Sequence, residues 1–444
     1  MIIGKNLNKE RTGIKMKNKN HTLKLCNYCN RVYDLNQKIS QISDGRVDPE
    51  IKLPPVILIV ILSLMSGLHS FSAMGEAVKD GDFDKFFSNT KLPSDDTIKD
   101  VLRKLNLEDL REIAASIVQK ARYNQALKSN TIEGMKVVAI DGTHIFSMSS
   151  ERLGENAQKR EYKDEEGNIT AVEYEENAVG VSYVGEGISL PLKLKRRSQG
   201  EGELTTAKKL VDELNRDHYQ YCDVIVGDSL YINGPFINRV LSNNKEVIVR
   251  VKQENNLKEN AEGLFKGKAP DHTYENVTPK DKRIVSGILY DLEIWEEENF
   301  IWSSVEKPLR VLKVKETKKK VNASGEVLEK ETQICYFATT MEESRVDAFT
   351  VWKIAHRRWD EENGIFHWLK TNWDLDRRYS HEPEIIQAMY YLYVIAYSLF
   401  LLYIHRNLRS FDPKKETKKK FIRRFYKGLI TLNQPLYYPG ITPG

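Results

Sequence analysis

The chain has 444 residues, of which 40% are apolar and 30% are charged, a composition ordinary for a folded protein of two to four domains. Composition excludes a disordered chain, and length excludes a small scaffold that needs disulfides or a metal to fold. Lys and Arg outnumber Asp and Glu by 68 − 63 = 5, so a polyanionic partner is permitted but not demonstrated.

The cysteines indicate a reducing compartment. Cys26, Cys29, Cys222 and Cys335 are too few for a disulfide framework, and no secretory leader opens the sequence, so we expect a cytoplasmic protein. Cys26 and Cys29 have the spacing of zinc ligands, but no second pair follows, and we predict no zinc site.

Residues 1–34 are polar and basic and are expected to form a tail. Residues 35–130 carry helical patterns and predict a helical N-terminal domain. Within it, Ser94 or Asp95 is expected to cap a helix whose buried positions are Ile98, Val101, Leu102 and Leu105.

From residue 131 the periodicity changes to that of strands. Apolar runs at 137–140, 179–184, 188–194 and 224–226, with a helical segment at 204–214, predict an α/β sheet over residues 131–245. Residues 246–345 are strand-rich and charged, which indicates a β-rich insertion. Helical periodicity returns over 346–410, and a basic segment fills 411–444.

Residues 385–404 are the one stretch that could cross a membrane, because twenty residues pass without a charge. Five tyrosines together with Gln387 and Ser398 would be poorly solvated by lipid. We therefore favour a buried core helix and predict no membrane partner.

Two aspartates follow apolar runs. Asp141 follows 137–140 and precedes Gly142-Thr143-His144, and Asp228 follows 224–227. Either alone is best explained as a turn cap, but two at strand ends can converge on one sheet edge. Carboxylates so placed could hold a pair of divalent ions about 3.5–4 Å apart.

A third carboxylate is predicted on the helical segment 354–370. Glu362 falls within the apolar stripe of Trp359, Phe366 and Leu369, where an unpaired carboxylate is costly, whereas Asp360 and Glu361 are expected on the solvated face. Arg358 lies one turn before Glu362 and could bind a phosphate, with Lys370 contacting another. Arg357 should point about 100° away on the helix, so Arg357→Lys should be nearly silent.

These residues resemble the three acidic motifs of bacterial insertion-sequence transposases of the cut-and-paste type. The matching segments are Asp141-Gly142-Thr143, Gly227-Asp228-Ser229-Leu230-Tyr231, and Arg358-Trp359-Asp360-Glu361-Glu362-Asn363 with Lys370. The helix departs from the family pattern, because Ala355 stands where a tyrosine is usual and Leu369 stands where the lysine is usual.

The resemblance implies a ribonuclease-H-like catalytic core that is interrupted by the β-rich insertion and preceded by a helical DNA-binding domain. It implies that Asp141, Asp228 and Glu362 form a catalytic triad holding two Mg²⁺ or Mn²⁺ ions. The implied activity is cleavage of DNA at transposon ends and strand transfer into target DNA by a homodimer bound to DNA.

Basic clusters offer further candidate DNA contacts, of which Lys193, Lys195, Arg196 and Arg197 are the first. Trp295 and Trp302 could stack on an extruded base, although a strand tryptophan is more often a core residue. Three rival interpretations remain: a nuclease with the same triad and no strand transfer, an inactive DNA-binding relative, and a membrane-associated protein.

Overall fold

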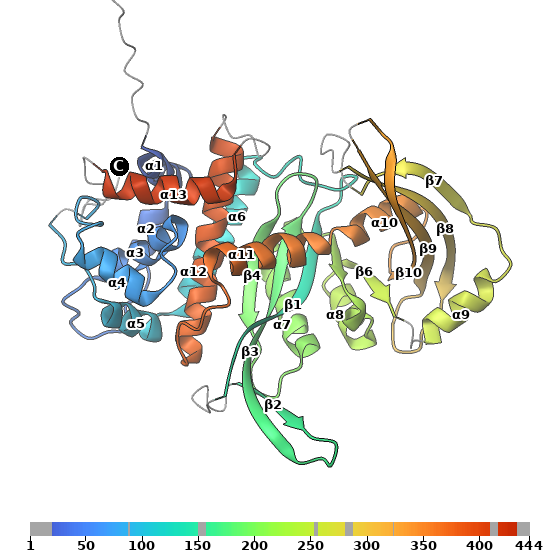
Figure 1. Cartoon of the computed structure of the whole chain (residues 1–444), viewed down its shortest axis with the longest axis horizontal. Coiled ribbons are helices and arrows are strands. Elements are labelled where there is room, and N and C mark those ends of the chain that lie inside the picture. The colour runs from blue at the N-terminus through green and yellow to red at the C-terminus, as the bar shows by residue number, and fades with distance from the viewer. Residues whose placement is uncertain are drawn as a thin grey trace, which may run out of the picture.

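A computed structural model gives the fold of the chain (Figure 1). It describes residues 20–87, 89–149, 157–252, 256–279, 287–322, 324–408 and 416–432, and the side chains of Tyr219, Glu362 and Asn363 lie outside that description. The predicted tail therefore falls largely outside the described residues. Its last part is not a tail, because residues 21–33 form helix α1.

A single ten-stranded sheet runs through the molecule in the order β2-β3-β1-β5-β6-β10-β9-β8-β7, with β4 also paired to β3. Strands β1, β5 and β6 are mutually parallel, and the remaining pairs are antiparallel. The strands are β1 (Val137–Met148), β2 (Gln158–Lys163), β3 (Ile169–Val184), β4 (Leu190–Arg196), β5 (Val224–Gly227), β6 (Glu246–Val251), β7 (His272–Val277), β8 (Ile288–Phe300), β9 (Leu309–Val321) and β10 (Val327–Thr339).

Alternation along the parallel strands divides the interior into two cores, because successive side chains of a strand point to opposite faces. On one face, residues such as Val137, Ala139 and Val226 pack with helix α10 (Ala348–His356). Odd-numbered positions of β1 therefore face α10. The helices on the other face are α7 (Glu203–His218) and α8 (Gly234–Ser242).

The helical domain lies at one end of the sheet (Figure 1). Its fifth helix is capped as predicted: the Ser94 hydroxyl accepts from the Thr97 N–H, and Ile98, Val101 and Leu102 are buried. The helices are α1 (His21–Tyr33), α2 (Leu35–Ser40), α3 (Leu53–Ser66), α4 (Phe71–Lys79), α5 (Asp95–Lys104) and α6 (Leu107–Tyr123).

Two C-terminal helices complete this domain. Helix α12 (Pro383–Leu402) contacts α3, α5, α6 and β4, and α13 (Lys418–Ile430) contacts α1 and α3. By length and composition α12, with the π-helical turn Tyr403–Asn407 that follows it, is able to cross a membrane, but 89% of its most apolar window is buried inside the protein. A helix apolar on all sides suits the centre of a large domain, as expected here.

The β-rich region at the other end is continuous with the central sheet, because β10 pairs with β6 over residues 336–339. Strands β7 to β10 curve away with helix α9 (Asn256–Phe265) at the end of the molecule (Figure 1). The predicted boundary at residue 246 differs in one respect: β6 pairs in parallel with β5 and so belongs with the central strands.

Between the two ends, the chain crosses the sheet from α10 to α11 (His367–Trp373) through a π-helical segment, Asp360–Phe366 (Figure 1). This segment contacts β1 and β3. Wider winding of this kind is rare and occurs most often at functional sites.

Candidate active site

The sequence suggested that Asp141 lies at the end of a strand, but it lies within strand β1. Strand β1 continues to Met148 because β3 pairs with it along its whole length. On its other side, pairing with β5 stops at Ala139, and in the part of the chain that the structure describes no strand lies beside the edge beyond this point. Asp141 shares the orientation of Val137 and Ala139 and therefore points to the face that α10 and the π-helical segment cover.

Asp228 follows β5 and serves as a turn cap. Its Oδ1 atom accepts a hydrogen bond of 2.7 Å from the Leu230 N–H, at the start of the short 3₁₀ turn Ser229–Tyr231. One carboxylate can cap a turn and still present its second oxygen elsewhere. Asp228 also lines the cavity described next.

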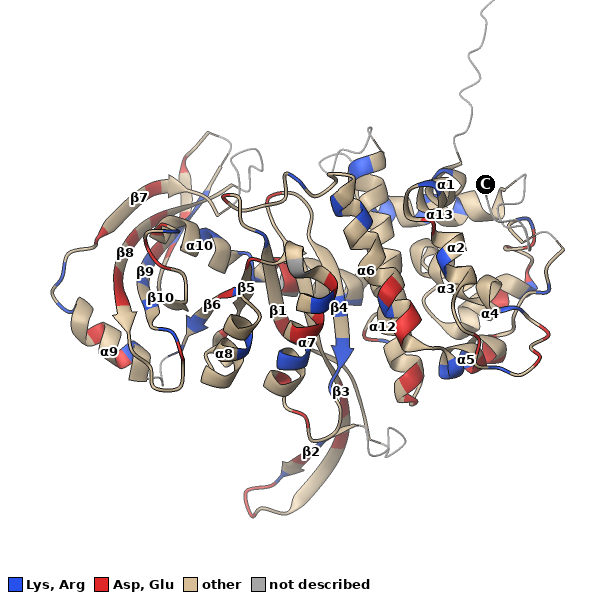
Figure 2. Cartoon of the chain, turned by 180° about the vertical axis from the view of Figure 1, so that it is seen from behind, with Lys and Arg blue, Asp and Glu red and all other residues tan. Residues whose placement is uncertain are grey.

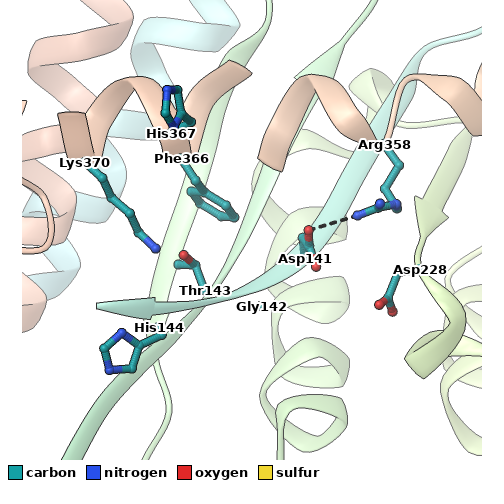
Figure 3. Close-up of a pocket in the computed structure, with 9 residues that line it drawn as sticks. All are labelled: Asp141, Gly142, Thr143, His144, Asp228, Arg358, Phe366, His367 and Lys370. Carbon is teal, nitrogen blue, oxygen red and sulfur yellow. Dashed lines mark hydrogen bonds and ion pairs between the residues drawn. The ribbon is translucent and has the colours of Figure 1, made fainter. Parts of the chain in front are cut away.

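A cavity of about 560 Å³ brings together residues from three parts of the chain (Figure 3). Asp141 and Asp228 enter it from the sheet, whereas Arg358 and Lys370 enter it from the helical crossing. The remaining lining residues are Gly142, Thr143, His144, Phe366 and His367. His144 is exposed and its Nε2 lies 2.8 Å from the Ser147 hydroxyl.

Arg358 and Asp141 form an ion pair in this cavity. The Arg358 Nη1 atom lies 3.2 Å from Asp141 Oδ2, and each side chain is 13% exposed. Figure 3 shows Asp228 pointing toward the same space from below the guanidinium. Lys370 is half-buried, and desolvation lowers the pKa of its amine. The cavity thus combines two carboxylates with two cations able to contact phosphate.

The helical crossing differs from the continuous α-helix that periodicity predicted. Helix α10 ends at His356, and Asp360–Phe366 is π-helical. A π-helix has more residues per turn, so spacing at 3.6 residues no longer tells which residue faces the sheet. The expectation that Glu361 is solvated is wrong: Glu361 is fully buried.

Glu361 lies against the strands beside Asp141. Its Oε1 atom accepts a 3.0 Å hydrogen bond from the Ser182 hydroxyl on β3, and Oε2 has no hydrogen-bond partner among the described residues. Burial, followed by the Asp141 charge, raises its pKa well above the usual value. Gly180, which pairs with Asp141, makes room for it, because a Cβ atom there would lie 2.9 Å from Glu361 Oε1.

The predicted third carboxylate, Glu362, belongs to the π-helical segment, but its side chain lies outside the described residues. The described residues offer the oxygen ligands that a hard divalent cation prefers. Asp141 and Asp228 offer carboxylate oxygens to one cavity, and Glu361 holds an unsatisfied buried oxygen beside Asp141. Such oxygens suit Mg²⁺ or Mn²⁺.

A second group of potential ligands lies in the β-rich region, away from this cavity. Atoms of His272, Glu296 and Glu343 lie within 4.8 Å of one another. However, Glu296 already accepts from Arg310 and lies 2.7 Å from His272 Nε2. The Glu296 carboxylate is therefore satisfied within the protein.

The predicted cluster of DNA-binding cations is largely engaged inside the protein. Lys193 is 4% exposed and pairs with Glu213 at 3.0 Å and Asp217 at 2.6 Å on α7, and Lys195 also pairs with Glu213. Figure 2 shows the basic strand β4 beside acidic residues of α7. These pairs join residues about 20 positions apart, which sequence inspection does not reveal.

Arg196 and Arg357 are likewise buried. Arg196 Nε donates to both Glu176 oxygens at 2.9 and 3.1 Å. Arg357 is 1% exposed and pairs with Glu186 and Asp360, so the expectation that its replacement is nearly silent is wrong. Arg197 is half-buried, and of the four clustered cations it is the one that forms no ion pair with a described residue. It lies near the carboxylate of Glu203.

Sequence reasoning missed two residues near the aspartates, the half-buried Glu203 and the fully buried Tyr231. The Tyr231 hydroxyl donates a 2.8 Å hydrogen bond to Glu203 Oε1. Tyr231 lies in the quoted segment after Asp228, but Glu203 begins a helix and carries no local signal of its position.

A comparison with protein families gives one match. A family model described as "Transposase DDE domain" matches residues 132–399, which is more than half of the chain and includes every residue of the cavity. No curated protein matches the chain.

Proposed function

Because the chain belongs to the family of transposase DDE domains, we propose that it cleaves DNA at the ends of an insertion sequence and transfers the freed strands to target DNA. One observation carries the proposal. Two aspartates from separate strands line one cavity with an arginine and a lysine, within the segment that the family model covers.

We assign the metal ligands to Asp141, Asp228 and Glu362, with Glu361 as the alternative third carboxylate. Bound divalent cations, Mg²⁺ or Mn²⁺ and two in number, would stabilise charge on the attacking and leaving oxygens of the phosphodiester. The fold fixes the positions of both aspartates. Asp141 lies on a paired strand, and Asp228 accepts a hydrogen bond from the Leu230 N–H.

Arg358 and Lys370 would bind the DNA backbone in this site. A guanidinium can contact a carboxylate and a phosphate together, so Arg358 would hold Asp141 and the scissile phosphate in one arrangement. Lys370 enters the cavity from the far end of the crossing and would contact a neighbouring phosphate (Figure 3).

The strand order supports a ribonuclease-H-like core. Strands β4, β3, β1, β5 and β6 lie side by side, with the last three parallel, and β7 to β10 are inserted between β6 and α10. We assign end recognition to the helical N-terminal domain, and DNA or dimer contacts to the basic C-terminal segment. A homodimer acting on DNA in the cytoplasm is part of this proposal.

The test uses the full chain and a duplex containing its flanking genomic DNA. With Mg²⁺ we expect strand cleavage at the element ends, followed by joined products when a target plasmid is added. Chelation of the metal, Asp141→Asn and Asp228→Asn should each abolish both reactions while DNA binding persists. Cleavage without joined products would indicate the nuclease alternative, and cleavage by either variant would refute the assignment.

A further inference from the structure

The two chain segments that carry Asp141 and Asp228 are both contacted by one half-buried carboxylate, Glu203. We propose that Glu203 is a positioning residue that holds these two segments at the spacing needed for metal binding. Glu203 does not line the cavity, so it acts through its neighbours. The inference rests on the proposed function, because it gives the aspartates the role of ligands.

Glu203 is the first residue of α7 and contacts both segments. Its Oε1 accepts the 2.8 Å hydrogen bond from the Tyr231 hydroxyl, three residues after Asp228. The same carboxylate lies directly against Gly142, the residue after Asp141, and the Gly142 backbone N–H stabilises its charged form. One side chain therefore contacts the chain close to each aspartate.

Two glycines provide the space for this arrangement. A Cβ atom on Gly142 would lie 2.1 Å from Glu203 Oε2, so no larger residue fits there without moving the carboxylate. A Cβ atom on Gly227 would lie 2.8 Å from the Tyr231 ring. Gly142 and Gly227 each adjoin an aspartate, so packing explains why glycine stands next to Asp141 and next to Asp228.

The tyrosine end of this connection is buried, and that makes its geometry specific. Tyr231 is fully buried and packs against Phe236, with ring centroids 4.9 Å apart. A buried donor that loses its acceptor is costly, so the Tyr231 hydroxyl constrains where the Glu203 carboxylate lies. Since parallel pairing of β1 with β5 ends at Ala139, no backbone hydrogen bond between these two strands fixes their spacing at Asp141.

The test measures metal binding in the absence of DNA. Mn²⁺ is titrated into the full-length protein by calorimetry, and thermal unfolding is followed for each variant. Glu203→Gln replaces one carboxylate oxygen by an amide N–H₂ that would lie against Tyr231 or Gly142, and Tyr231→Phe removes the hydroxyl but keeps the ring. We expect each variant to bind Mn²⁺ about 10–100-fold more weakly, as is typical when a residue supporting a metal ligand is lost.

Two matched controls separate this effect from general destabilisation. Tyr183→Phe removes a fully buried hydroxyl that has no hydrogen-bond partner, and Glu201→Gln changes a glutamate two residues away that pairs with Lys209. Both should bind Mn²⁺ as the wild type does. If Glu203→Gln fails to fold, Tyr231→Phe decides the matter alone.

The outcomes distinguish the inference from the function on which it rests. If the wild type binds Mn²⁺ and both test variants bind it within twofold, the inference is overturned and the proposed function stands. If the wild type binds no Mn²⁺, the proposed function fails and the inference fails with it. Weaker binding by both test variants and by neither control supports the positioning role.

Discussion

Replacement of Arg358 by lysine keeps the charge and tests whether the shape of the guanidinium matters. The Arg358 Nη1 atom is 3.2 Å from Asp141 Oδ2, and both side chains are 13% exposed, so solvent screens the pair only in part. Lysine ends in a single nitrogen, which is expected to contact either Asp141 or a phosphate but not to bridge them.

The expected loss is one charge-assisted hydrogen bond. Such bonds contribute about 1.5–3 kcal/mol, which corresponds to roughly 10–150-fold in the rate of cleavage. The rate is measured in a single turnover, on DNA ends bound before Mg²⁺ is added, so that weaker DNA association does not contribute.

Arg377→Lys provides the matched control, because Arg377 is 52% exposed and lies 3.9 Å from its partner Asp374. Its rate should equal that of the wild type. Arg357 cannot serve as the control, since it is buried between Glu186 and Asp360. Equal rates for the wild type and Arg358→Lys would show that Arg358 does not bridge Asp141 and the phosphate.

Four further predictions concern charged or titratable groups. Glu362→Gln should abolish cleavage and leave DNA binding intact. Glu361→Gln should chiefly stabilise the protein at neutral pH, because the raised pKa of Glu361 makes the free energy of unfolding fall as pH rises above about 4.5. Urea unfolding at several pH values should show that glutamine removes this dependence. Loss of cleavage in Glu361→Gln alone would transfer the ligand role to that residue. Lys193→Met should cost about 1–3 kcal/mol of unfolding free energy, because the buried Oδ2 atom of Asp217 loses its cation while Oδ1 keeps Arg111. It should not change the salt dependence of DNA binding, and an altered salt slope at unchanged stability would contradict the buried pair. Burial lowers the pKa of His218 to about 4, so the unfolded state takes up the extra proton between pH 6.5 and 4, and stability should fall by about 3 kcal/mol as pH falls through that range. His218→Gln should remove this fall, and identical pH profiles for the two proteins would contradict it.

The sequence by itself determined features that depend on neighbouring residues. The cap of α5 at Ser94 is confirmed, because an N-cap bond joins residues three apart. Helix α3 begins at Leu53 with Pro54 and Pro55 in its first turn, and its residues are apolar on every side; both features are visible along the chain alone. The apolar runs at 137–140 and 224–226 form strands as predicted, because the spacing and branching of apolar side chains are local properties of the sequence.

Tertiary structure decided which carboxylate and which cations the site uses. The π-helical winding of Asp360–Phe366 buries Glu361, although α-helical spacing had placed it in solvent. Lys193 and Arg196 look available for DNA when read along the chain, but Asp217 and Glu176 reach them from α7 and β3. The sequence alone does not show which charged side chains form buried pairs and which stay exposed. Burial makes an unpaired charge costly, and burial arises only when strands and helices pack together.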